Sequence, residues 1–233
     1  MIKIDLITGF LGSGKTTFLR KYASYLITQG QNIGILENDF GAVNVDMMLL
    51  GDLRGDNCEL EMISGGCDAD THRRRFKTKL ISMGMCGYDR VIVEPSGIYD
   101  VDEFFDTLHE EPLDGWYQIG NVITVLDSNL EENLPEGADF LLASHAGCII
   151  LSKTQETTEP DQKNAVDHLN RALEKIGCKR QFDKVFAKDW DKLTDEDFKK
   201  LLSCGYRMEN YLKPDLTQEK TFQSLYFMNM HLT

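Results

Sequence analysis

The amino-acid sequence predicts a single doubly wound α/β domain built on a mostly parallel sheet. Two observations predict it. Short runs of β-branched residues alternate with stretches whose apolar residues recur at helical spacing, and a glycine-rich segment joins the first such run to the first helix. With 233 residues, the chain is long enough for one well-packed domain and rather short for two. We expect the domain to cover residues 1–210 and an extension to cover 211–233.

The N-terminal part of the chain is expected to form a strand, a loop and a helix. The apolar run between Ile2 and Ile7 predicts the strand, and apolar residues at helical spacing over 17–28 predict the helix. The joining segment, Gly9-Phe10-Leu11-Gly12-Ser13-Gly14-Lys15-Thr16-Thr17, fits the phosphate-loop pattern of glycine, four residues and Gly-Lys-Thr at every fixed position. The strand and the helix supply the context that this motif requires.

The elements expected after the first helix alternate along the chain. The expected strands cover 32–37, 58–63, 89–94, 121–126, 147–151 and 184–187, and the expected helices cover about 71–83, 161–176 and 195–202. Segment 221–228 has three interpretations: an added edge strand, a dimer contact or the stump of a lost domain. In an open sheet of this kind, ligands bind at the carboxyl ends of the strands, so the polar residues there are the candidate site.

The phosphate loop predicts binding of a nucleoside triphosphate. Small residues let consecutive backbone N–H groups close around phosphate oxygens, and the positive end of the next helix adds to the attraction. We expect Lys15 to neutralise the β- and γ-phosphates and the Thr16 hydroxyl to hold Mg²⁺. The residues expected to cradle the phosphates are Gly9, Gly12, Ser13, Gly14, Lys15, Thr16 and Thr17. The alternative is a glycine-rich turn that holds no ligand.

Two further strand ends carry carboxylates. One ends in Glu94-Pro95-Ser96-Gly97, where Glu94 can hold a water of the Mg²⁺ shell and the Gly97 N–H can meet the γ-phosphate and sense its loss. The other ends in Glu37-Asn38-Asp39-Phe40-Gly41, where Glu37 or Asp39 can orient the attacking water or bind Mg²⁺. Together with Lys15, these residues form the expected catalytic group. The alternatives are a Pro-Ser-Gly turn with an incidental glutamate and a capped turn.

A third strand end, Ser152-Lys153-Thr154-Gln155, resembles the guanine-recognition element of GTPases, usually Asn/Thr-Lys-x-Asp. With the phosphate loop and the two carboxylate segments, the ordered set resembles the CobW-type GTPases, relatives of the metallochaperones UreG and HypB. The likeness covers about residues 1–190, and the phosphate loop is close to a family signature.

This resemblance implies a P-loop GTPase domain over residues 1–210 that binds GTP and GDP with Mg²⁺. It further implies that hydrolysis is coupled to delivery of a metal ion, or of a metal cofactor such as a corrinoid, to a client metalloprotein or corrinoid protein. The resemblance also implies that Ser152, Lys153 and Gln155 line the guanine base. The metal motif of the family, Gly-Cys-x-Cys-Cys, would fall at residues 66–70.

The chain departs from the family at that metal motif. Cys67 remains, but Ala69 and Asp70 replace the other two thiolates, and a tight site for Zn²⁺ depends on several sulfurs. A weaker mixed site for Zn²⁺ or Co²⁺, built from Glu37, Cys67, Asp70 and His72, stays open. The alternatives are that Asp70 caps the helix expected from residue 71, that Cys67 is a small buried residue, and that His72 is a polar surface group.

A second departure concerns the base. In the family pattern an Asp carboxylate accepts from guanine N1–H and from the exocyclic amine, whereas Gln155 offers one acceptor oxygen and an NH₂ group. We expect weaker discrimination against adenine. Lys153 can still stack its aliphatic stem on the base, and Glu156 can replace the missing carboxylate if the loop is shifted by one residue.

The composition limits the partners. The net charge of −13 argues against nucleic acid or an anionic membrane as the main partner, because both repel an acidic surface. The six cysteines form no Cys-x-x-Cys pair, so we expect neither a disulfide framework nor a zinc knuckle. Because no signal peptide or long apolar span is evident, we expect a soluble, cytoplasmic protein. A homodimer is one possible assembly.

Two functions of other classes stay open, a small-molecule kinase and a nucleotide-binding module that does not hydrolyse its ligand. In a kinase, a basic stretch of this chain would act as a lid over the phosphates. This stretch contains His72, Arg73, Arg74, Arg75, Lys77 and Lys79. The same stretch can also dock an acidic partner, supply an arginine to the phosphates, or form a solvated helix face.

Overall fold

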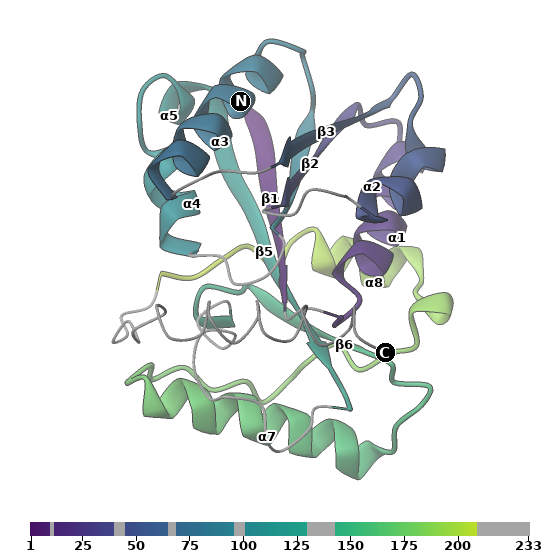
Figure 1. Cartoon of the computed structure of the whole chain (residues 1–233). Helices are drawn as coiled ribbons and strands as arrows, with labels where there is room; N and C mark the ends of the chain where they lie inside the picture. The colour runs from purple at the N-terminus through teal and green to yellow at the C-terminus, as the bar shows by residue number, and fades with distance from the viewer. Residues whose placement is uncertain (10–11, 40–44, 65–68, 96–100, 130–142, 209–233) are drawn as a thin grey trace, which may run out of the picture.

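The computed structural model describes residues 1–9, 12–39, 45–64, 69–95, 101–129 and 143–208. Their strands form one six-stranded sheet in the order β3-β2-β4-β1-β5-β6, and every neighbouring pair is parallel (Figure 1). The strands are β1 (Ile2–Gly9), β2 (Ile33–Asp39), β3 (Cys58–Ser64), β4 (Arg90–Pro95), β5 (Tyr117–Asp127) and β6 (Cys148–Ser152). The predicted doubly wound fold with a parallel sheet is confirmed.

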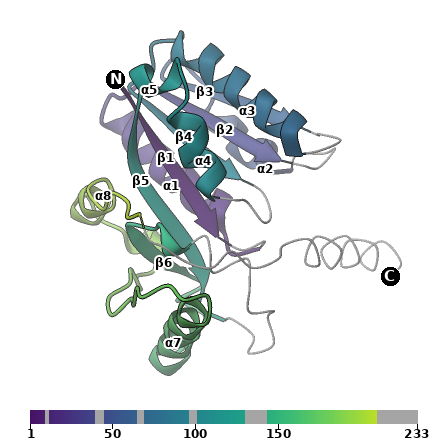
Figure 2. The same cartoon turned by 90° about the vertical axis from the view of Figure 1, so that its left-hand side faces the viewer.

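Helices cover both faces of this sheet (Figure 2). They are α1 (Lys15–Thr28), α2 (Val45–Leu50), α3 (Ala69–Gly84), α4 (Val101–Leu108), α5 (Leu113–Trp116), α7 (Glu159–Lys175) and α8 (Asp195–Leu201), with 3₁₀ turns η1 (Gly51–Leu53) and η2 (Trp190–Lys192). One apolar cluster packs α3, α4, α5 and α7 on the sheet, and a second packs α1, α2 and α8 on the other face. Burial on both faces explains the nearly continuous apolar runs in the strands.

The strand order places the end of β1 at the centre of the molecule. Strand β1 lies between β4 and β5. After β1 the chain forms β2, β3 and β4, all on one side of β1, and it then crosses to the other side to form β5 and β6. Such a reversal of strand order opens a crevice at the carboxyl ends of the strands, where α/β proteins bind ligands. The loop after β1 therefore begins at the position that this topology favours for a site.

A buried ionic cluster fixes β1 against its neighbours. The register of β1 against β5 shifts between Ile4 and Leu6, so that Asp5 faces a bulge in β5. Asp5 accepts hydrogen bonds from the backbone N–H of Asn121 at 2.8 Å and from the Tyr22 hydroxyl at 2.7 Å. It also forms an ion pair with Arg90, whose side chain is only 5% exposed. These four residues tie β1 to α1, β4 and β5.

Several predicted boundaries needed correction. Helix α7 begins at Glu159, two residues before the prediction, because Thr158 is its N-cap and forms a capping box with Asp161. Strand β5 begins at Tyr117 rather than at residue 121. The strand predicted over 184–187 is wrong: within it only Phe186 pairs with the sheet, through a bridge to Ile150. Residues 209–233, including the predicted segment 221–228, lie outside the described residues.

Candidate functional site

The loop between β1 and α1 needs glycine at its ends. Gly9 has φ +144°, and a Cβ there would lie 2.3 Å from the carbonyl oxygen of Val125 in β5. Gly14, the N-cap of α1, has φ +90°, and a Cβ there would lie 3.3 Å from Cη2 of Trp190. Gly12 also has a positive φ of +78°. Any side chain would therefore strain this backbone, and at Gly9 it would collide with β5.

The first turn of α1 meets the carboxyl end of β4. Thr16 donates a hydrogen bond from Oγ1 to Oε1 of Glu94 at 2.8 Å. The preceding residue, Lys15, is buried, with 7% of its surface exposed. Glu37 in β2 is the register partner of Glu94, and both carboxylates are 2% exposed. Hydroxyl and carboxylate oxygens are the hard ligands that Mg²⁺ prefers, so the donor set fits this ion.

Three predicted site residues have no described side chain. Asp39 is the last residue of β2 and pairs in register with Ser64, but only its backbone is described. Gly97 and Cys67 lie outside the described residues. Their roles at the γ-phosphate and at a metal ion remain predictions.

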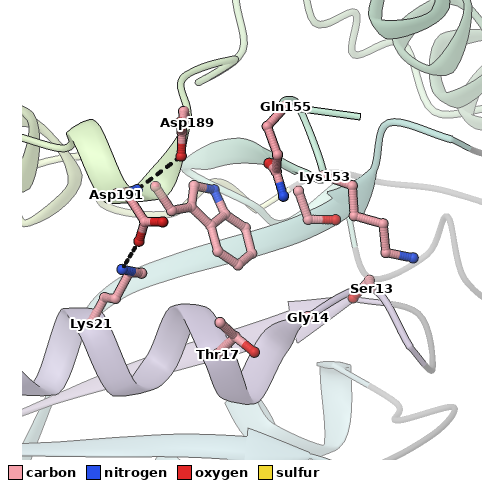
Figure 3. Close-up of a pocket in the computed structure, with 10 residues that line it drawn as sticks. Ser13, Gly14, Thr17, Lys21, Lys153, Gln155, Asp189 and Asp191 are labelled. Carbon is pink, nitrogen blue, oxygen red and sulfur yellow. Dashed lines mark hydrogen bonds and ion pairs between the residues drawn. The ribbon is translucent and has the colours of Figure 1, made fainter. Parts of the chain in front are cut away.

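A cavity of about 220 Å³ lies between the start of α1 and the carboxyl end of β6 (Figure 3). It is lined by Ser13, Gly14, Thr17, Lys21, Ser152, Lys153, Gln155, Asp189, Trp190 and Asp191. Phosphate-loop residues thus share one cavity with the three residues predicted to line a base. Ser152 is buried, and Gln155 is exposed at the cavity.

Lys153 is held in an unusual conformation at this cavity. Its φ is +54°, the left-handed region that residues other than glycine seldom adopt, and its ammonium group pairs with Asp127 at the end of β5. The chain therefore turns sharply after β6. Such strain in a residue is typical of sites in which the surrounding structure holds a side chain in place.

The opposite wall of the cavity is a turn that the sequence analysis missed. In it, Trp190 packs its ring 5.6 Å from that of Phe18, and Asp191 pairs with Lys21 at 2.6 Å. Asp189 accepts a hydrogen bond from the Asp191 backbone N–H at 3.0 Å; this bond and one from Lys192 lower the pKa of the Asp189 carboxyl. Phe186 pairs with the edge of the sheet, and Asp189 follows it by three residues. Ligands bind at the carboxyl ends of strands, so the polar residues after Phe186 were a signal that could have indicated this turn.

The region around the predicted metal motif differs from the interpretations based on sequence. Asp70 lies inside the first turn of α3, which begins at Ala69, so it is not the N-cap. His72 is 1% exposed rather than a surface group, and burial, with the charge of Arg75, lowers its pKa. Among the described residues no group of three or more His, Cys, Asp or Glu side chains is placed to share a metal ion.

Part of the basic stretch is paired within the chain. Arg73 and Lys77 of α3 both bind Glu110, at 2.6 and 2.5 Å, and Lys79 binds Glu61 of β3 at 2.7 Å. The paired side chains are between 29% and 42% exposed, so each pair contributes little to stability. They hold three of the basic side chains on the surface of α3, which favours the solvated helix face over a lid. In the part of the chain that is described, no helix has the length and apolar character needed to cross a membrane.

Comparison with known proteins gives a family match and several relatives. The family model described as CobW/HypB/UreG, nucleotide-binding domain, matches residues 3–183. The zinc chaperone YjiA of Escherichia coli (strain K12) is 29% identical over 173 residues, covering 69% of this chain and 52% of that protein. The zinc chaperone YeiR of the same strain is 29% identical over 184 residues, covering 78% and 54%. The chain thus spans about half the length of the curated relatives it matches.

Two solved structures share the fold of this chain. HypB from Helicobacter pylori in complex with nickel aligns with a TM-score of 0.50 and 21% identity, covering 86% of this chain and 85% of that chain. FtsY from Mycoplasma mycoides aligns with a TM-score of 0.54 and 15% identity, covering 87% and 66%. At these identities the likeness shows a common fold and nothing about the ligand.

Proposed function

The chain belongs to the CobW/HypB/UreG family, and we propose that it binds and slowly hydrolyses GTP in complex with Mg²⁺ as a switch that controls metal delivery. The observation that carries the proposal is the hydrogen bond between Thr16 and Glu94, 2.8 Å long, directly after a glycine-constrained loop. It joins a phosphate-loop hydroxyl to a carboxylate from the neighbouring strand. Burying a carboxylate costs free energy, and a turn that binds no ligand gains nothing that would offset the cost of burying Glu94.

Each residue of the site has a distinct role in this proposal. The backbone N–H groups of Gly12, Ser13 and Gly14 bind the phosphate oxygens, assisted by the positive end of α1. Lys15 neutralises the β- and γ-phosphates, and Thr16, with Glu94 and Glu37 behind it, holds Mg²⁺. When bound, Mg²⁺ neutralises charge on the phosphates during transfer.

Hydrolysis requires a placed water and a sensor of the γ-phosphate. We assign the water to Glu37 or Asp39 at the end of β2, and the sensor to Glu94 and the N–H of Gly97 after β4. Without a partner, switch GTPases turn over slowly, on the order of 10⁻⁴ per second when the site lacks an arginine and about 10⁻² per second when the chain supplies one, and we propose a rate in this range.

The delivery role rests on the relatives. YjiA and YeiR are zinc chaperones, and HypB binds nickel in its solved structure, so a transition metal such as Zn²⁺ or Co²⁺ is the proposed cargo. Cys67 is the one remaining thiolate of the family motif, which makes it the candidate soft ligand. The proposed recipient is a client metalloprotein, or a corrinoid protein if the cargo is a metal cofactor. We further propose that residues 1–210 form the GTPase domain, with 211–233 as an extension of it, and that the chain can form a homodimer.

Calorimetry and a phosphate-release assay on the full chain test the proposal. We expect GTP and GDP to bind in the presence of Mg²⁺, and phosphate to be released from GTP with no acceptor added. Lys15→Ala should abolish binding, because no other described residue replaces its charge in the loop. Lys3→Ala is the matched control, since Lys3 is exposed near the opposite end of β1.

The outcomes separate the proposal from the other functions. Unchanged GTP affinity in Lys15→Ala would remove the phosphate-loop assignment. Phosphate transfer only to an added acceptor would indicate a kinase, and GTP recovered intact after long incubation would indicate a binding module. Repeating the titration with Zn²⁺ or Co²⁺ tests the cargo: a metal that binds with the same affinity in all nucleotide states contradicts a nucleotide-controlled delivery role.

A further inference from the structure

The cavity beside the phosphate loop is lined by one aromatic side chain and by polar ones. Trp190 is the aromatic residue that lines the cavity. Its neighbours in sequence, Asp189 and Asp191, lie on one side, and Lys153 and Gln155 lie on the other (Figure 3). The volume of about 220 Å³ is below the 300–1,000 Å³ of typical ligand pockets, so it suits part of a nucleotide rather than the whole. Because Ser13 and Gly14 line its lower edge, a ligand whose phosphates lie on the loop would extend its nucleoside into this cavity.

Trp190 is fixed firmly enough to serve as a wall. Its six-membered ring approaches Gly14 so closely that a Cβ there would lie 3.3 Å from it, and its indole packs on Phe18. The next residue, Asp191, is tied to α1 through Lys21 at 2.6 Å. Buried indole N–H groups ordinarily have an acceptor, yet Trp190 Nε1 has none among the described residues. Trp190 is therefore held in place by contacts with the loop and with α1.

We propose that the purine base of the nucleotide packs against the Trp190 indole and that its edge is read by the Gln155 amide, so that guanine and adenine are both accepted. The proposal rests on nucleotide binding as the function. Trp190 supplies base affinity that does not depend on which purine is present, because every base has an aromatic face. Gln155 supplies a hydrogen-bonding edge that suits both purines.

The chemistry of the amide explains this dual reading. With guanine, Oε1 of Gln155 accepts from N1–H and Nε2 donates to O6. With adenine, Oε1 accepts from the N6 amine and Nε2 donates to N1. A carboxylate at this position has no donor, so it can form two hydrogen bonds with the N1–H and amine of guanine but only one, from the N6 amine, with adenine. Gln155 is exposed and lines the cavity, so its amide is accessible to a ligand in either role.

Fluorescence of Trp190 in the full chain tests the proposal. The chain has two tryptophans, and the other, Trp116, lies in α5 before the start of β5, so Trp116→Phe leaves Trp190 as the sole reporter. In this background, titration with Mg²⁺ complexes of GTP and ATP should quench the Trp190 emission. Their affinities should lie within about tenfold of each other. The Mg²⁺ complex of inorganic tripolyphosphate, which has no base, should bind more weakly.

Three variants separate the contributions. The two Trp190 variants lose the fluorescent reporter, so their affinities are measured by calorimetry. Trp190→Ala should weaken GTP and ATP binding roughly ten- to a hundredfold, the usual loss when an aromatic platform for a base is removed, and should leave tripolyphosphate binding unchanged. Trp190→Phe keeps an aromatic surface, so it should retain most of the affinity and shows that a loss in Trp190→Ala is not a folding defect. Gln155→Asp should raise the preference for GTP over ATP at least tenfold.

Each result has a defined meaning. If Trp190→Ala changes GTP affinity less than twofold, or weakens tripolyphosphate equally, the indole merely supports the loop and the inference is overturned. Equal affinities for GTP and tripolyphosphate in the parent protein overturn the inference while leaving the phosphate cradle intact. If none of the three ligands binds, nucleotide binding itself fails, and the inference fails with it.

Discussion

The buried carboxylate of Asp5 offers the sharpest test of how the site is held in place. Its side chain has no exposed surface, and it accepts hydrogen bonds from Tyr22, from the Asn121 N–H and from Arg90. Burial and the nearby Asp5 charge raise the pKa of Tyr22 well above 10, so the phenol remains a donor. Because Asp5 lies four residues before Gly9, the cluster sets the position of the strand that carries the phosphate loop.

Asp5→Ala should be strongly destabilising. It leaves the Arg90 guanidinium, only 5% exposed, without its carboxylate, and Nε of Arg90 has no acceptor among the described residues. Removing one partner of a buried ion pair costs about 3–5 kcal/mol. That is a large share of the roughly 5–15 kcal/mol by which folded domains are stable. Urea unfolding followed by circular dichroism measures the change in the free energy of unfolding.

Two comparisons make this prediction refutable. Asp52→Ala breaks an ion pair with Arg20 in which both side chains are about half exposed, and it should cost less than about 1 kcal/mol. Asp5→Leu combined with Arg90→Met removes both buried charges and should recover most of the stability lost in Asp5→Ala. A loss below about 1 kcal/mol in Asp5→Ala, or a double variant as unstable as the single one, would refute the claim that an unpaired buried charge causes the loss of stability.

Three further predictions concern the site and the acid stability. Glu94→Gln should weaken Mg²⁺ binding to the nucleotide complex about 10- to 100-fold, because it removes the charge that orients Thr16; a Mg²⁺ titration of phosphate release measures this. Gly9→Ala should destabilise the domain by more than the roughly 1–3 kcal/mol of backbone strain alone, since its Cβ also collides with β5, and thermal unfolding would detect it. Hydrogen bonds from Lys188 and from the N-terminus of α8 lower the pKa of Asp197, so the folded state binds this proton less readily than the unfolded state. Its contribution to stability is therefore present above about pH 4 and lost as the pH falls, and Asp197→Asn should flatten acid unfolding curves over that range.

The sheet could be predicted from the sequence because its strands are buried on both faces. Strand β4 is buried through its length, has the apolar run Val91-Ile92-Val93 at its centre, and lies within one residue of the predicted bounds. Strand β5 was predicted too short, since Gln118 and Gly120 precede its buried half and interrupt the apolar pattern. Helix α4 was missed although Val101, Phe104, Phe105 and Leu108 recur at helical spacing, so that omission was avoidable.

The phosphate loop was predictable because its function depends on residues adjacent in sequence. The opposite wall of the cavity was not, because it depends on contacts between distant segments. Lys21 and Asp191 are separated by 170 positions, and the strand expected before that wall forms only a single bridge. No periodicity marks a turn whose position is set by one ion pair and one aromatic contact. Such a wall is found only when the fold has brought the two segments together.

The departures from the family pattern fall on the residues that would select a base or a metal ion, not on those of the phosphate loop. The residues proposed to bind the triphosphate, Gly9, Lys15 and Thr16, are intact. At both ends of the loop, Gly9 and Gly14 have positive φ angles that strain any side chain. Those that would choose between ligands are altered: two thiolates of the metal motif are gone, and Gln155 replaces the carboxylate that reads guanine. Phosphate binding depends on backbone geometry, whereas selectivity for a base or a metal depends on single side chains. Selectivity can therefore change without disturbing the fold, and the altered positions are where this chain should differ in function from its relatives.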